Sequence, residues 1–108
     1  MEVVKRLVKA GGEVNIQIKD GKWKGSTPLL HSSRNGHVEV VKSLIRAGGK
    51  VNSQTAGGST PLLWASRRGH VEVITALLAA GADKRIKNKR GKTPHEVAKN
   101  PATRNALK

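Results

Sequence analysis

The chain has 108 residues, of which 21 are lysine or arginine and 7 are aspartate or glutamate, so its formal net charge is +14. This length allows one domain, and a core built from 36% hydrophobic residues with two tryptophans and no other aromatic residue must be aliphatic. The absence of cysteine excludes a disulfide scaffold, a zinc ribbon and thiol chemistry. The most apolar stretch, residues 73–82, is shorter than the roughly 20 residues that a membrane-spanning helix needs.

The first apolar stretch predicts a helix over residues 2–10. Charged side chains interrupt it, which argues against a signal peptide. Its Glu-Val-Val and Ala-Gly letters return 37 positions later, at 39–41 and 47–48. We therefore expect residues 1–19 to form a partial repeat that contributes a second helix without its first helix.

A 33-residue repeat organises the rest of the chain. Thr-Pro pairs stand at 27–28, 60–61 and 93–94, and segments 27–52 and 60–85 are identical at 14 of 26 positions. Threonine is a good N-cap, and proline suits the first helical position because its missing N–H costs nothing there. Gly36 and Gly69 are expected to end the first helix of each unit, since glycine readily adopts positive φ.

Each unit continues with a second helix that carries an apolar stripe, at 40, 41, 44 and 45 and again at 73, 74, 77 and 78. The third unit is cut short. Thr93 and Glu96 have the spacing of a capping box, and Asn100-Pro101 can start a last short helix. The prediction is a single domain over residues 1–108, with full repeats at about 20–52 and 53–85 and a truncated repeat at 86–108.

The T-P-L-x-x-A/S motif, the following Gly-His, the apolar second helix and its final Ala-Gly together resemble the ankyrin repeat over essentially the whole chain. This resemblance implies an all-α solenoid of helix-turn-helix units with short hairpin-like loops, acting as a non-catalytic module for protein–protein interaction. It also implies a structural role for His37 and His70 at the helix–helix turns. Leu30 and Leu63 replace the histidine that usually follows T-P-L, so its hydrogen bonds are expected to be missing.

No motif for catalysis or metal binding is found. Gly91-Lys92-Thr93 ends like a phosphate-binding loop, but Ile86 stands where that loop requires glycine. The four histidines lack the spacing of metal ligands, and the seven carboxylates include no convincing acid–base pair. We expect neither enzyme activity, nor a metal, nor a cofactor.

Basic residues concentrate where the family resemblance puts the contact surface, on the loops and first helices. Six of the nine residues from 84 to 92 are basic. Such a surface attracts anionic partners. The residues expected to bind a partner are Trp23, Lys24, Arg34, Trp64, Arg67, Arg68, Lys87, Lys89, Arg90 and Lys92.

The leading hypothesis is an acidic protein or peptide bound on this basic concave face. The alternative is RNA or another polyanion on the same face, with Trp23 stacking on a base. Three further interpretations stay open: a solvated face that only keeps the protein soluble, a nuclear localisation signal, and a Trp23 that folds back onto the next repeat. Trp64 is expected to be mostly core and partly groove wall.

We expect a soluble intracellular protein, cytoplasmic or nuclear, with no membrane partner. It would be a monomer or a segment of a longer repeat array.

Overall fold

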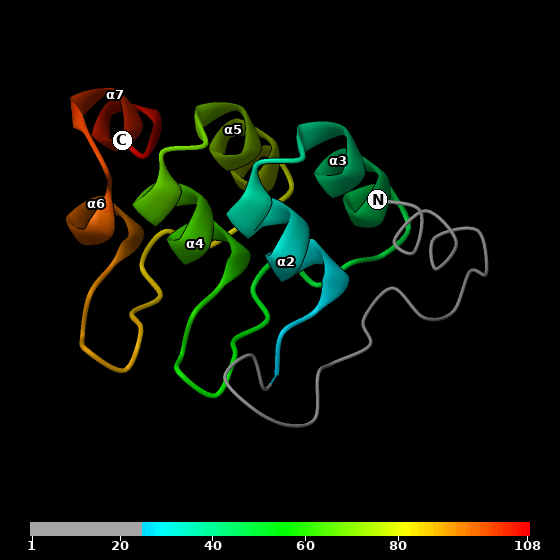
Figure 1. Cartoon of the computed structure of the whole chain (residues 1–108), viewed down its shortest axis with the longest axis horizontal. Helices are drawn as coiled ribbons and strands as arrows, with labels where there is room; N and C mark the ends of the chain where they lie inside the picture. Colours follow the sequence, from blue (N-terminus) through cyan, green and yellow to red (C-terminus); the bar gives the residue numbers. More distant parts are fainter. Residues whose placement is uncertain (1–24) are drawn as a thin grey trace.

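The computed structural model describes residues 25–108. The predicted helix over residues 2–10 and the site residues Trp23 and Lys24 lie outside this range. In the described part the order is α2 (Pro28–Asn35), α3 (Val38–Arg46), α4 (Pro61–Arg68), α5 (Val71–Ala79), α6 (Pro94–Val97) and α7 (Pro101–Ala106), with no strand. Helices α2, α4 and α6 form one row and α3, α5 and α7 a second, and the loops before α4 and α6 extend on the same side (Figure 1). The predicted all-α solenoid is therefore confirmed.

The first helix of each unit begins at its Thr-Pro pair, as predicted. The Thr27 hydroxyl accepts a hydrogen bond from the N–H of Leu30 at 3.2 Å, and Thr60 caps α4 in the same way. At α6 the predicted capping box is complete, because the Thr93 hydroxyl accepts from the Glu96 N–H and the Glu96 carboxylate accepts from the Thr93 N–H. Each bond satisfies a donor that the first helical turn would leave without a partner.

The core lies between the two rows of helices and runs from unit to unit. The predicted stripes are buried along one edge, where Val41, Leu44 and Leu77 are fully enclosed, whereas Ile45 and Leu78 are partly exposed. The buried apolar cluster is Leu29, Val41, Leu44, Leu62, Ala65, Val73, Ile74, Leu77, Ala82 and Leu107. Helix α2 packs on α4 and α3 on α5, so burial of this cluster ties each unit to the next.

Two separate features require glycine at position 36, in the turn between α2 and α3. Gly36 has φ 74°, a left-handed conformation, and a Cβ there would lie 2.7 Å from the imidazole of His70 in the next unit. The His70 Nε2 lies 2.9 Å from the Arg34 carbonyl oxygen and donates to it. His70 thus joins consecutive units, the structural role that the family resemblance implies.

We expect His70→Ala to lower the free energy of unfolding by about 1–2 kcal/mol, because the inter-unit hydrogen bond is lost. Urea unfolding followed by circular dichroism measures this change. His95→Ala is the matched control, since His95 is exposed and forms no comparable bond. Equal stability of the two variants would contradict this role for His70.

The truncated last unit leaves the repeat register after α6, which has only four residues. The backbone N–H of Lys99 donates to the Ser66 carbonyl at 3.0 Å, and α7 then packs on α5. Asn100 caps α7 by accepting from the Thr103 N–H at 2.9 Å, which confirms the predicted last helix. This path holds Lys99 beside the end of α4.

Candidate partner-binding surface

Trp64 collects three guanidinium groups around its ring. It is half-buried on α4, and the Cζ atoms of Arg34, Arg67 and Arg68 lie 5.7, 5.8 and 5.8 Å from the ring centroid. These distances fall within the range of cation–π attraction. Arg34 lies in the last turn of α2, and the other two arginines lie in the last turn of α4. Two units therefore contribute to this Trp64 cluster, which we define as Trp64 with these three arginines.

The charges of the Trp64 cluster are partly explained by their position. Cations in the last turn of a helix interact favourably with the carbonyl end of the helix dipole. The arginine side chains still repel one another. Burial and then the charge of the neighbouring Arg68 lower the pKa of Arg34, although the guanidinium stays protonated. The ion pair within residues 25–108 joins Asp83 to Arg85 at 3.2 Å, so carboxylates there do not neutralise Arg67 or Arg68.

The hairpin loop over residues 87–92, ahead of α6, holds four more cations on an ordered backbone. The Asn88 side-chain oxygen accepts from the N–H groups of Arg90 at 2.9 Å and Lys92 at 3.1 Å. The N–H of Lys89 donates to the Gly57 carbonyl at 3.1 Å and ties this loop to the preceding one. The exposed cations of this hairpin loop are Lys87, Lys89, Arg90 and Lys92.

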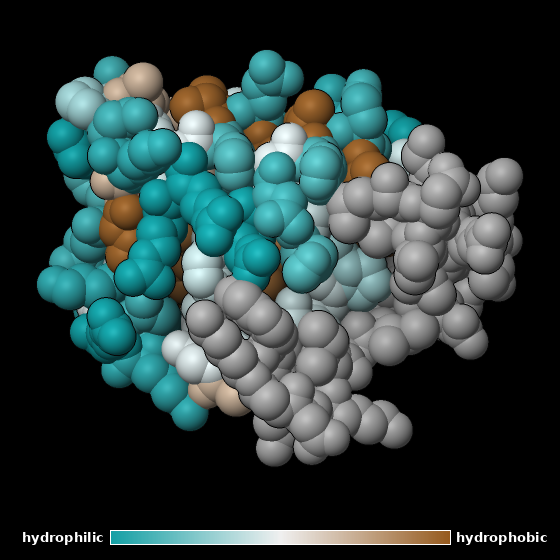
Figure 2. Space-filling model, in the orientation of Figure 1, coloured by the Kyte–Doolittle hydropathy of each residue, from teal (hydrophilic) through white to brown (hydrophobic). Residues whose placement is uncertain are grey.

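The Trp64 cluster and the hairpin loop border one small hollow. Trp64 and Arg67 line it from α4, and Asn88 lines it from the loop. Hydrophilic side chains cover much of the surface over α2 and α4, while apolar side chains show along the row of α3 and α5 (Figure 2). The structure thus brings together eight of the ten predicted site residues in two adjacent groups, and the other two, Trp23 and Lys24, lie outside the described range.

A larger hollow of about 470 Å³ lies at the C-terminal end of α4. Its lining combines Arg67 and Arg68 with three residues that sequence analysis did not select: Asn35, His70 and Lys99. His70 was assigned a structural role alone, and Lys99 comes after the chain leaves the repeat register. The 33-residue spacing therefore gave no signal for placing Lys99 there.

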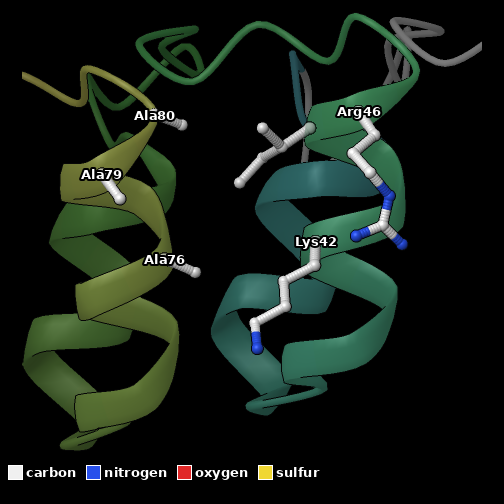
Figure 3. A pocket seen from close by; sticks show the side chains of 6 residues that line it. Lys42, Arg46, Ala76, Ala79 and Ala80 are labelled. Atoms are coloured by element: carbon white, nitrogen blue, oxygen red, sulfur yellow. The ribbon is translucent and has the colours of Figure 1, made fainter.

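A third hollow, of about 320 Å³, lies between α3 and α5 on the row of second helices. Methyl groups of Ala76 and Ala79 of α5 and of its C-cap residue Ala80 lie opposite Lys42 and Arg46 of α3 (Figure 3). The cations of α3 are not repeated on α5, because Thr75 and Ala79 occupy the corresponding positions. This groove contains none of the predicted site residues.

His31 of α2 occupies the register position of Trp64. Burial, then Arg34 and then His37 lower its pKa below the ordinary value of 6.5. Because the folded state disfavours the protonated ring, the contribution of His31 to the free energy of unfolding is fully present above pH 6.5. This contribution is lost as the pH falls through the lowered pKa.

We expect the NMR titration midpoint of His31 to lie below 6.5, and Arg34→Gln to raise it only partway, since burial is the larger cause. A midpoint at or above 6.5 in the unmodified protein would contradict the burial of this ring.

The structure contains, within residues 25–108, no group of three or more histidine, cysteine or acidic residues placed to hold a metal ion. None of the helices in that range is long and apolar enough to cross a membrane.

Comparison with known proteins agrees with this architecture. A family model of ankyrin repeats in three copies matches residues 1–88. The crystal structure of the ankyrin repeat domain of Bcl-3, described as a unique member of the IkappaB protein family, is similar with a TM-score of 0.86 and 31% identity. The similarity covers 99% of this chain and 46% of that one, so this chain spans about half the length of its structural relative. No curated protein sequence matches the chain. The chain therefore belongs to the ankyrin repeat family, whose repeats are modules for protein–protein interaction on a generally non-catalytic fold.

Proposed function

We propose that this protein binds an acidic segment of a partner protein on its basic face, defined as the Trp64 cluster together with the hairpin-loop cations Lys87, Lys89, Arg90 and Lys92. The observation that carries the proposal is the gathering of three guanidinium groups within 5.8 Å of one indole ring, beside a loop rich in lysine. Within residues 25–108, the ion pair between Asp83 and Arg85 includes neither Arg67 nor Arg68.

Arginine suits the recognition of carboxylates, because its planar guanidinium can donate two parallel hydrogen bonds to one carboxylate. Contact with the Trp64 ring restricts the arginine side chains before a partner arrives, which lowers the entropy lost on binding. The exposed part of the indole adds an apolar contact of the kind that often dominates binding energy in protein interfaces.

RNA or another polyanion would meet the same charges. The described residues offer less for base stacking, because guanidinium groups already lie against the Trp64 ring and Trp23 is outside the described range. Binding of an acidic protein segment is therefore the function that the geometry supports best.

Capture on a peptide array tests this function. Peptides of equal length with acidic, neutral and basic compositions are probed with the purified chain near physiological salt, about 0.15 M, where surface charges still attract over about 8 Å. We expect capture to concentrate on the acidic peptides and to fall as salt is added. Equal capture of acidic and neutral peptides would reject the proposal, and displacement of the acidic peptides by trace RNA would favour the polyanion.

A further inference from the structure

The hollow at the C-terminal end of α4 gathers cations from separate parts of the chain. Asn35 comes from the end of α2, Arg67 and Arg68 come from the last turn of α4, and Lys99 comes from the segment between α6 and α7. The ion pair of the described residues, between Asp83 and Arg85, lies elsewhere in the sequence. Three positive charges therefore line one depression of about 470 Å³ that has no carboxylate in its lining.

The carbonyl ends of α2 and α4 weaken this positive potential without cancelling it. Each helix end carries about half a negative charge, so two ends amount to about one charge against three cations. Hydrogen bonds also occupy one carbonyl in the last turn of α4, because the N–H groups of Gly69 and Lys99 both donate to the Ser66 oxygen. The net field in the hollow favours an anion.

A phosphate monoester matches this lining better than a carboxylate does. It carries a charge of about −1.5 to −2 and three strong acceptor oxygens, which suit several arginine and lysine donors at once. The Asn35 amide adds a neutral donor in the same lining. The volume of about 470 Å³ leaves space for the side chain that bears the phosphate.

We infer that this hollow binds a phosphorylated side chain of the partner's acidic segment, so that phosphorylation of the partner strengthens the complex. This inference rests on the proposed function, because Arg67 and Arg68 belong to both the basic face and the hollow. A phosphorylated peptide is favoured over RNA because these cations gather at one end of α4, which fits a single dianion better than a strand with one charge at each phosphodiester.

Three peptide pools test the inference by fluorescence anisotropy with the whole chain. All are acidic with randomised flanks, and the central position is serine, phosphoserine or a pair of glutamates that matches the added charge. We expect the phosphoserine pool to bind at least tenfold tighter than the serine pool and clearly tighter than the glutamate-pair pool.

Lys99→Met is expected to reduce the preference for phosphoserine to about threefold or less while changing the affinity for the serine pool little, and Lys99→Arg is expected to keep the preference. Lys42→Met is the matched control, because it removes the same charge from α3, outside the hollow. Thermal unfolding checks that all three variants are folded.

The outcomes separate this inference from the proposed function. Equal binding of the phosphoserine and glutamate-pair pools, or an unchanged preference in Lys99→Met, would overturn the inference and leave acidic binding intact. Failure of all three pools to bind would reject both. Single-stranded RNA and unlabelled phosphoserine peptide can be compared as competitors at equal phosphate concentration. If RNA displaces the phosphoserine pool at a lower phosphate concentration than the peptide does, and Lys99→Met abolishes this difference, the hollow would be assigned to RNA instead.

Discussion

Replacing both Arg67 and Arg68 by glutamate is expected to weaken the binding of an acidic peptide by about 100-fold. Each reversal exchanges an attraction for a repulsion, and a change of about 1.4 kcal/mol in each corresponds to a factor of ten in affinity. Both side chains are exposed, so larger effects typical of buried ion pairs are not expected. Isothermal titration calorimetry with one acidic peptide from the array measures the change.

The matched control reverses two charges on the other row of helices. Lys42→Glu/Arg46→Glu also lowers the net charge by four, but both residues lie on α3 beside the groove toward α5. If net charge alone drove binding, the two double variants would lose affinity equally. Our account predicts a much smaller loss, below about tenfold, for the α3 pair because only long-range attraction is reduced.

Leu77→Ala is expected to destabilise the fold by about 3 kcal/mol, within the range of about 2–5 kcal/mol for truncating a fully buried leucine. Leu77 has no exposed surface and lies in the cluster that joins α4 and α5 to their neighbours. Small domains are stable by only about 5–15 kcal/mol, so a large part of the stability would be lost. Denaturant unfolding of the variant measures the difference.

The neighbouring leucine supplies the control for this substitution. Leu78→Ala makes the same chemical change one position later, where the side chain is only partly buried. Its expected loss of stability is smaller, because less apolar surface leaves water on folding and the space left behind is open to solvent. Equal losses for the two variants would contradict the described orientation of α5.

The starts of α2, α4 and α6 and the ends of α2 and α4 could be predicted because local chemistry determines them. Threonine and proline set the first turns at Thr27, Thr60 and Thr93, and positive φ at Gly36 and Gly69 ends the first helices, whatever packs around them. The apolar stripes were predicted less completely. A helical spacing identifies the buried side but not how far neighbouring units cover Ile45 or Leu78.

The sequence predicted which positions belong to the basic face but not how their side chains are arranged in space. The gathering of Arg34 from one unit with Arg67 and Arg68 from the next around Trp64 depends on how the units pack, which spacing within one unit does not reveal. Trp64 is half-buried and lies outside the buried apolar cluster, whereas it was expected to be mostly core and partly groove wall. The position of Lys99 follows from the early end of α6 at Val97, which breaks the repeat on which the sequence reasoning relied.

The most direct test of the basic face is NMR mapping of the isotope-labelled chain as an acidic peptide is added. Our account predicts that resonances of the Trp64 indole N–H, the Arg67 and Arg68 side chains and the backbone of residues 87–92 shift together and saturate together. Resonances around Lys42 on α3 would stay in place. Shifts confined to α3 and α5 at saturation, with Trp64 and the hairpin loop unaffected, would contradict it.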